Sequence, residues 1–241
     1  VEQMKRRLNA VPLVLQLPVG IEDSFTGIID LIRMECLIWD DDSLGATYTT
    51  SEIPPDLRER AETAREQMIE ALGENDDAIM EAYLGETEIT EEALHEAIRR
   101  VTLGLKMVPV LCGSALKNKG VQPLLDAISR WLPSPVEVPP IQGTNPETGE
   151  KVTCRPNEKD PLAALIFKVS MMEGRKLTFV RVYSGVLQTG GDVYNISLNK
   201  KEKLSRMFKL HANKRERVDA AGPGSIIGVV GLKESATGET L

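Results

Sequence analysis

VPVLCGSALKNK, residues 108–119, is the stretch that decides the expected fold of this part of the chain. Its first four residues are typical of a buried strand, and residues 120–132 have the pattern of a helix. In open α/β sheets, ligands bind in loops at the carboxyl ends of strands. Small residues here would let backbone N–H groups approach a flat ring, which suits recognition of a base edge. The motif alone is weak, because many strand–loop–helix junctions contain Gly-Ser-Ala without such a role.

The composition is that of an ordinary globular protein. The chain has 241 residues, of which 41% are hydrophobic and 27% charged, so it has room for one large domain or two to three small ones. It contains no run of 18 apolar residues, and its first residues do not resemble a secretory signal. Three distant cysteines argue against a disulfide framework or a zinc site. We therefore expect a cytoplasmic setting and no membrane contact.

Charge is unevenly distributed along the chain, whose formal net charge is −7. Residues 51–100 contain 15 acidic and five basic residues, whereas residues 199–217 contain eight basic and two acidic residues. One acidic and one basic block indicate contacts with two different partners. The basic block is a candidate for phosphate contact, while the overall acidity argues against general coating of nucleic acid.

The first part of the chain mixes strands and helices. Strands are expected at residues 11–17 (ended by Pro18), within 25–39, and at 48–50. Helices are expected at residues 1–9, 55–72, 75–84, 90–102 and 120–132. Asn75 and Thr90 are the predicted N-caps, because such side chains accept hydrogen bonds from first-turn N–H groups. The predicted buried face of the second helix contains Leu57, Ala61, Ala64, Met68 and Leu72.

The second part of the chain has a proline-rich segment followed by short strand patterns. Residues 133–161 contain seven prolines and read as a linker or extended connection. Short β-runs then occur at residues 165–169, 177–183, 193–196, 204–210 and 226–232. This spacing favours a small closed β-barrel over a sandwich. Neither end of the chain shows a capping or terminal element, so we expect both ends to be cut from a longer protein.

Several strings in this order resemble bacterial elongation factor G. They are residues 113–122 (GSALKNKGVQ), 132–135 (LPSP), 181–185 (RVYSG), 211–215 (HANKR), 231–233 (GLK) and 237–241 (TGETL). The resemblance implies a central fragment of a translational GTPase that lacks the N-terminal nucleotide-binding motifs and the C-terminal domains. One departure is the short loop at residues 170–176, where relatives commonly carry an Asp-Pro-Phe-type loop, so contacts of that loop are not transferred.

The resemblance also implies a domain organisation. Residues 1–20 and 105–140 would be the C-terminal remnant of a P-loop GTPase α/β domain. Residues 21–104 would be an α+β insert called G-prime, and residues 141–160 a linker. Residues 161–241 would be the β-barrel domain II of translation factors, itself truncated.

By the same resemblance, Ser114, Ala115 and Leu116 would form the guanine-contacting loop. The Ala115 N–H would face the guanine O6, Ser114 would brace the loop, and Leu116 would pack beside the base. GTP or GDP with Mg²⁺ would be the cofactor of the intact protein, which would hydrolyse GTP to drive translocation of tRNA and mRNA.

The chain lacks the parts that hydrolysis requires. It has no G-x-x-x-x-G-K-[ST] motif, since residues 185–190 are followed by Gly191-Asp192 and read as a hairpin turn. It has no Asn-Lys-x-Asp motif. The most similar string is Asn-Lys-Arg-Glu at residues 213–216. No catalytic or metal-binding residue is assigned. His95 is expected to be a surface or half-buried residue. This chain alone is predicted to be inactive and to bind GTP or GDP no better than at millimolar concentration.

Two charged surfaces remain as candidates for ribosome contact, and we expect a monomer. Helical spacing places Glu59, Glu62, Glu66 and Glu70 on one face, which is either a solubilising surface or a docking face for the ribosomal stalk protein. The basic residues are either a charged barrel face or a contact with ribosomal RNA phosphates. They are Lys200, Lys201, Lys203, Arg206, Lys209, Lys214, Arg215 and Arg217.

Two alternatives stay open. One is a paralogous translational GTPase that acts in ribosome recycling or ribosome protection. The other is a stand-alone ribosome-binding module without a nucleotide role. The sequence alone does not identify the elongation factor G paralogue.

Overall fold

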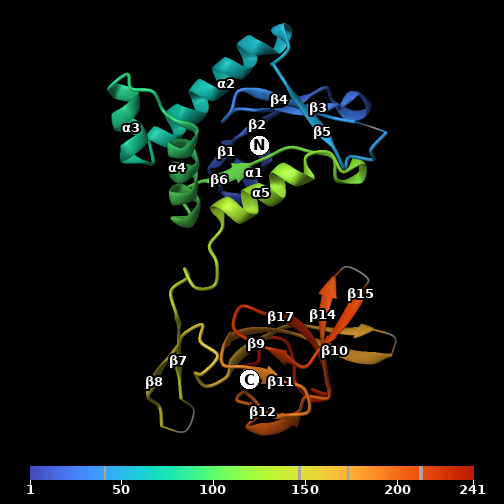
Figure 1. The fold of residues 1–241 in the computed structure, drawn as a ribbon. Helices are drawn as coiled ribbons and strands as arrows, with labels where there is room; N and C mark the ends of the chain where they lie inside the picture. Colours follow the sequence, from blue (N-terminus) through green and yellow to red (C-terminus); the bar gives the residue numbers. More distant parts are fainter. Residues whose placement is uncertain (41, 146–147, 173, 212–213) are drawn as a thin grey trace. The chain divides into compact units, whose positions relative to one another are not determined.

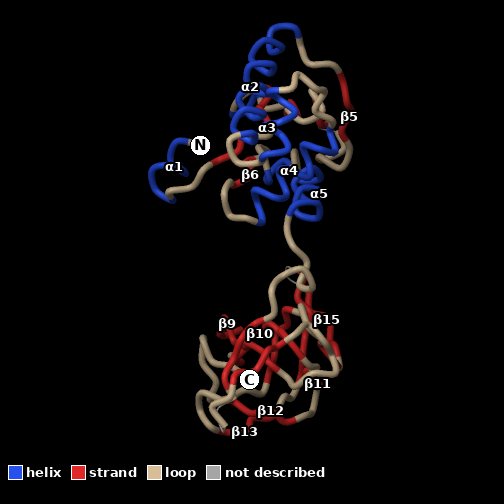
Figure 2. Tube along the Cα trace, turned by 90° about the vertical axis from the view of Figure 1, so that its left-hand side faces the viewer, coloured by secondary structure: helices blue, strands red, loops and turns tan. Residues whose placement is uncertain are grey.

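The computed structural model describes residues 1–40, 42–145, 148–172, 174–211 and 214–241. The chain divides into two compact units, Val1–Leu132 and Pro133–Leu241 (Figure 1). Helices gather in the first unit, and strands dominate the second (Figure 2). In the part of the chain that the structure describes, no helix combines the length and apolarity that a membrane crossing requires.

The described residues of the first unit form two separate sheets. Strands β1 (Pro12–Val14) and β6 (Val108–Val110) form a parallel pair. Strands β2 (Gln16–Val19), β3 (Gly27–Asp30), β4 (Glu35–Trp39) and β5 (Tyr48–Ser51) form an antiparallel sheet in that order.

The prediction of one strand over residues 11–17 is wrong, because the chain changes sheet at Leu15. The Leu15 N–H donates to Val110 O, while Leu15 O accepts from Leu31 N, each at 3.0 Å. The next strand, β2, is an edge strand and therefore tolerates Pro18, which has no N–H to donate. Local pattern alone did not separate two buried strands that follow each other directly.

Helices cover the sheets of the first unit. They are α1 (Glu2–Leu8), α2 (Pro55–Gly73), α3 (Asp77–Leu84), α4 (Glu91–Leu103) and α5 (Val121–Trp131), with short 3₁₀ turns at Glu22–Ser24 and Ala115–Lys117. The predicted N-cap Thr90 is confirmed, since its hydroxyl accepts from Ala93 N. Asn75 is not the cap of α3. That role belongs to Asp76, which accepts from Ile79 N, while the Asn75 amide donates to Ala71 O.

Helices and sheets of the first unit share one core. The predicted buried face of α2 is confirmed: Ala61, Met68 and Leu72 are buried, and Leu57 and Ala64 pack against the same core. Leu13 of β1, Leu15 between β1 and β2, Leu31 directly after β3, and Leu94 and Ile98 of α4 complete its centre. Each fully buried aliphatic side chain of this kind contributes about 1.5–3 kcal/mol to stability.

The second unit begins with a β-hairpin inside the predicted linker. Strands β7 (Ile141–Thr144) and β8 (Lys151–Cys154) pair antiparallel, so the segment expected to be a linker, residues 141–160, contains a hairpin. Turn chemistry explains the hairpin: Gly149 has a φ of +73° and its N–H donates to Asn145 O at 2.9 Å. The proline content of the flanking segments masked this pattern in the sequence.

The remaining strands form the barrel-like body of the second unit. The main sheet has the order β15-β14-β17-β10-β9, and the pairs β11–β16 and β12–β13 form two further small sheets. Their bounds are β9 (Ala163–Met172), β10 (Arg175–Ser184), β11 (Leu187–Gln188), β12 (Asp192–Asn195), β13 (Lys200–Lys203), β14 (Arg206–His211), β15 (Lys214–Val218), β16 (Ala220–Ala221) and β17 (Ile226–Val230). Sequence patterns missed β11, β13, β15 and β16, because two-residue strands and the charged runs of β13 and β15 show no apolar alternation.

Residues 239–241 pair with β9, a contact that the sequence did not reveal. Ala164 N donates to Leu241 O, Ile166 N to Glu239 O, and Leu241 N to Ala164 O, at 2.8–2.9 Å. On its other side, this segment accepts a bond from Ile196 N, directly after β12, at Thr240 O. It therefore bridges the β9 edge of the main sheet to the β12–β13 pair. The core beneath contains Ile166, Val180, Val182, Leu204, Val229 and Leu241.

Candidate functional sites

The loop after β6 is held in a defined conformation. Ser114 N donates to Lys119 O at 2.8 Å, and Lys119 N donates to Ser114 O at 3.0 Å, which closes the 3₁₀ turn between them. A Cβ on Gly113 would lie 2.6 Å from Lys119 O, so the close approach of the two loop ends requires glycine. The loop therefore does not depend on a ligand for its shape.

Side chains after the loop anchor it to the antiparallel sheet, and sequence reasoning missed them. The buried Lys119 Nζ donates to Phe25 O at 3.3 Å, and the Asn118 amide donates to Leu44 O at 3.2 Å. Gln122 accepts from Trp39 Nε1 at 3.2 Å and donates to Gly45 O at 2.9 Å. The only sequence signal for these contacts was the run of polar residues after Leu116. Their partners could not be predicted, because they lie far away in sequence.

The predicted base-contacting residues lie on the outer side of this loop. The Leu116 side chain is 95% exposed, and Ala115 is also exposed. Within the described residues the Ala115 N–H donates no hydrogen bond, as expected for the first turn of a 3₁₀ helix. Ser114 closes the loop through its backbone. The loop thus presents one available N–H beside an uncovered apolar side chain.

The neighbouring Cys112 does not supply a nucleophile. Burial raises the pKa of its thiol to about 11, so the thiol stays protonated near neutral pH. Among the residues that the structure describes, no three histidine, cysteine, aspartate or glutamate side chains form a metal-binding cluster.

The four predicted glutamates of the acidic surface share the solvent face of α2. Glu59, Glu62, Glu66 and Glu70 are all exposed. Glu62 lies 3.5 Å from Arg58 one turn earlier, so part of its charge is neutralised. Exposed pairs of this kind contribute little to stability, which leaves the glutamates free to exchange partners.

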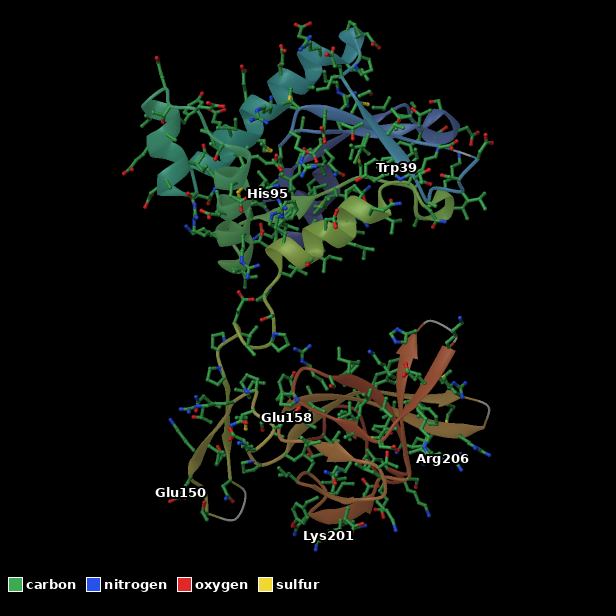
Figure 3. All side chains as sticks on the ribbon, viewed as in Figure 1. Trp39, His95, Glu150, Glu158, Lys201 and Arg206 are labelled. Carbon is green, nitrogen blue, oxygen red and sulfur yellow. The ribbon has the colours of Figure 1, made fainter. Side chains whose placement is uncertain are left out.

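The predicted basic block is divided by the fold into two areas. Lys200, Lys201 and Lys203 lie on β13, whereas the other five residues lie on the β14–β15 hairpin. Figure 3 shows Lys201 and Arg206 on different parts of the second unit. Lys200 forms an ion pair with Glu234 at 2.6 Å, which raises the pKa of the lysine. Asn213, part of the string nearest to Asn-Lys-x-Asp, lies outside the described residues.

The β14–β15 hairpin places arginines around an aromatic ring. Phe208 is opposite Arg217 and Leu210 is opposite Arg215, so these side chains share one face. A small cavity of about 70 Å³ beside this face is lined by Phe208, Arg206 and Arg215, and by Arg175 from β10. Arg175 was not among the predicted contact residues, because it lies far from the basic block in sequence.

Comparison with known proteins agrees with these observations. Residues 161–241, from before β9 to the end of the chain, match the family model of elongation factor G domain 2. Over all 241 residues the chain is 52% identical to elongation factor G 2 of Syntrophus aciditrophicus (strain SB). Along its whole length the chain is thus similar to elongation factor G. It spans 36% of the length of that elongation factor G 2.

The fold comparison extends the likeness over nearly the whole chain. A solved structure from Thermus thermophilus matches with a TM-score of 0.72 at 25% sequence identity. The match covers 99% of this chain and 33% of the Thermus chain. The predicted resemblance to elongation factor G is therefore confirmed, and residues 161–241 of the second unit match elongation factor G domain 2.

Proposed function

We propose that this chain is the section of a ribosome-dependent translational GTPase that carries a guanine-contacting loop, an inserted subdomain and domain 2. In the intact protein, hydrolysis of GTP held with Mg²⁺ would drive movement of tRNA and mRNA through the ribosome. The observation that carries this proposal is the 52% identity to elongation factor G 2 along the entire chain.

The proposed activity is tested best in a chimera. The 241 residues replace the aligned section of the Syntrophus elongation factor G 2, and ribosome-stimulated GTP hydrolysis and translocation are measured. We expect both activities to persist. A folded chimera without ribosome stimulation would contradict the proposal.

The topology supports an insert between two neighbouring strands of a GTPase domain. Strands β1 and β6 pair in parallel although the antiparallel sheet and α2–α4 lie between them in sequence. Parallel neighbours require a crossover connection, and here that connection carries its own antiparallel sheet and three helices. Because β2 belongs to the antiparallel sheet, the insert would begin near Leu15 and not at residue 21. Residues 105–140 and the domain 2 match at 161–241 complete the proposed order.

The Ala115 N–H is proposed to donate to the guanine O6. The change Ala115→Pro removes this N–H and suits the backbone, because Ser114 has the extended φ of −125° and ψ of 98° that precede proline. In the chimera, GDP affinity should fall about three- to tenfold, the contribution of one neutral hydrogen bond. Ala115→Ser keeps the N–H and should bind GDP normally. Equal GDP affinity of the proline and serine variants would show that the Ala115 N–H does not contribute to GDP binding.

The isolated chain is expected to bind GTP or GDP no better than at millimolar concentration. One backbone hydrogen bond contributes roughly 0.5–1.5 kcal/mol, which cannot replace the phosphate loop and Mg²⁺ of a complete site. Calorimetric titration measures this directly. Micromolar affinity for either nucleotide would show that the site is more complete than we propose.

The acidic face of α2 is proposed to dock the C-terminal domain of the ribosomal stalk protein. Glu62→Lys combined with Glu66→Lys should weaken binding on the order of tenfold at low ionic strength, since favourable charge pairs become unfavourable. The effect should shrink at high salt because of screening. Glu81→Lys with Glu92→Lys makes the same charge change at exposed positions of α3 and α4 and should have less effect. Unchanged affinity of the α2 variant at low salt would leave only a solubilising role.

The arginine face of β14–β15 is proposed to contact ribosomal RNA phosphates. Arg215→Glu with Arg217→Glu should weaken ribosome binding and reduce the slope of log affinity against log salt by roughly two, about one per lost phosphate contact. A parallel pair, Lys201→Glu with Lys203→Glu, tests β13 separately. Arg6→Glu with Arg7→Glu in α1 controls for net charge. An unaltered salt slope in both barrel variants would exclude phosphate contact by this block.

A further inference from the structure

The outer face of the main sheet in the second unit carries most of the phenylalanines of the chain. Of the four phenylalanines, Phe167, Phe179 and Phe208 lie on β9, β10 and β14 of this sheet (Figure 1). The barrel core, with Val180 and Met207, occupies the other face of the same strands. Phe167 is 42% exposed, and the other two rings are half-buried. Exposed apolar groups that gather in one place indicate a binding surface.

Strand pairing aligns two of the rings with basic residues in one row across the sheet. From β9 to β15 the row consists of Lys168, Phe179, Gly228, Phe208 and Arg217. Side chains of residues paired directly across strands lie on the same face. Neighbouring strands are about 4.8 Å apart, so the two phenylalanines start about 10 Å from each other. Each ring can therefore contact a different flat group of a ligand.

The surface between the rings is apolar. A Cβ on Gly228 would lie 3.0 Å from Leu177 Cδ1 and 3.1 Å from Leu210 Cδ1, so both leucines reach over the glycine on this face. Phe167 lies in a β-bulge of β9, and its ring centroid is 6.2 Å from that of Phe179. The rings and the two leucines thus form an apolar strip across the sheet.

Positive charge surrounds this strip. Arg175, Arg206 and Arg215 line the small cavity beside Phe208. The five strands, all of whose residues the structure describes, contain one acidic residue, Glu216, which alternates to the other face. The second unit as a whole has 16 basic and 12 acidic residues, although the chain is acidic. The surface therefore suits a partner that combines negative charges with flat apolar groups.

We propose that this face binds a single-stranded segment of RNA. Its bases stack on the phenylalanine rings, and the phosphates between them contact the surrounding arginines. Sequence-tolerant binding of this kind needs unpaired bases, because the bases of a duplex are stacked inside the helix. The choice of RNA rests on the proposed ribosome contact of the β14–β15 arginines, and the rings add recognition of unpaired bases to that contact.

An RNA strand and a strand without bases separate stacking from charge. The probes are a fluorescein-labelled ten-nucleotide RNA that cannot pair with itself and an abasic ribose-phosphate strand of the same length. Both are titrated with the unaltered 241-residue chain at low salt and followed by fluorescence anisotropy. The RNA should bind about tenfold more tightly, since stacking of one base on one ring has an effect of this size.

Three results of this titration would overturn the proposal. The abasic strand binds as tightly as the RNA, or polyglutamate of equal charge does so. In the third, the probe stays bound after the complementary strand is added, whereas we expect duplex formation to release it.

Matched aromatic variants test the contact from the side of the protein. Phe167→Leu keeps an apolar side chain but removes the ring, so RNA affinity should fall about tenfold while affinity for the abasic strand stays. Phe208→Leu should repeat this loss at the second ring. Tyr194→Leu, at a 40% exposed position of β12, should change neither affinity. Unchanged RNA affinity in both phenylalanine variants would show that the bases do not stack here.

The variant Arg215→Glu with Arg217→Glu separates this inference from the proposed phosphate contact. It should weaken binding of the RNA and of the abasic strand alike. If it does so while the phenylalanine variants have no effect, the phosphate contact stands and stacking is wrong. If only the phenylalanine variants weaken RNA binding, stacking stands and the proposed phosphate contact is wrong. The two probes on the unaltered chain decide even if a variant does not fold.

Discussion

Asn195→Ala is expected to destabilise the second unit by about 2–4 kcal/mol. Asn195 is fully buried, with 0% exposure, in the barrel core. Its amide nitrogen donates to Ser235 Oγ at 2.9 Å and to Glu239 Oε2 at 2.7 Å, and its oxygen accepts from Leu198 N at 3.1 Å. The alanine removes all three hydrogen bonds at a buried site and leaves the Leu198 N–H without its acceptor, although Ser235 and Glu239 keep bonds to Glu202 and Ala236 N. It also loosens the segment at residues 239–241 that bridges β9 to the β12–β13 pair.

The positions of the two tryptophans allow the stability of the two units to be measured separately. Both tryptophans, Trp39 and Trp131, lie in the first unit, so tryptophan fluorescence reports only that unit. Calorimetry should show a lower-temperature transition for the second unit, while the tryptophan-monitored urea midpoint stays in place. Ser197→Ala, at an exposed position two residues along, serves as the matched control. A loss below about 1 kcal/mol for Asn195→Ala would show that the polar cluster is not a determinant of stability.

Arg100→Ala is expected to destabilise the first unit by about 2–3 kcal/mol at neutral pH. Arg100 Nε and Nη2 donate to the two carboxylate oxygens of Asp76 at 2.7 and 3.0 Å. Asp76 is nearly buried and also caps α3. Without Arg100 a buried carboxylate remains unpaired. Half of the Arg100 side chain is exposed, which keeps the loss below that of a fully buried pair.

This contribution depends on pH in a defined direction. The hydrogen bonds from Arg100 are the main reason why the pKa of Asp76 is lowered. The pair therefore stabilises fully above the unfolded pKa of about 4, and its contribution disappears as the pH falls through the lower folded pKa. Urea midpoints followed by tryptophan fluorescence should differ most at neutral pH, and the difference should shrink progressively as the pH falls below the unfolded pKa of about 4.

A matched control separates this effect from the loss of any surface arginine. Arg58→Ala removes the exposed pair with Glu62 and should cost less than about 0.5 kcal/mol. A difference between Arg100→Ala and the unaltered chain that persists unchanged at low pH would contradict the ionic explanation.

The sequence by itself determined the features that depend on neighbouring residues. Apolar spacing at helical period specified α2, α4 and α5, and Thr90 marked the start of α4. The small residues after β6 marked the loop proposed to contact the base, because the expected role depends on a strand end and a helix start that are adjacent in the chain. The ordered strings specified the relationship to elongation factor G without any knowledge of three-dimensional contacts.

Only the tertiary structure decided the features that join distant segments. It paired β1 with β6, divided the basic block between β13 and the β14–β15 hairpin, and gathered Phe167, Phe179 and Phe208 on one face of the main sheet. It also brought residues 239–241 between β9 and β12. The physical reason is that strand pairing and burial depend on partners far along the chain. Such partners leave no periodic signal in the segments that they join.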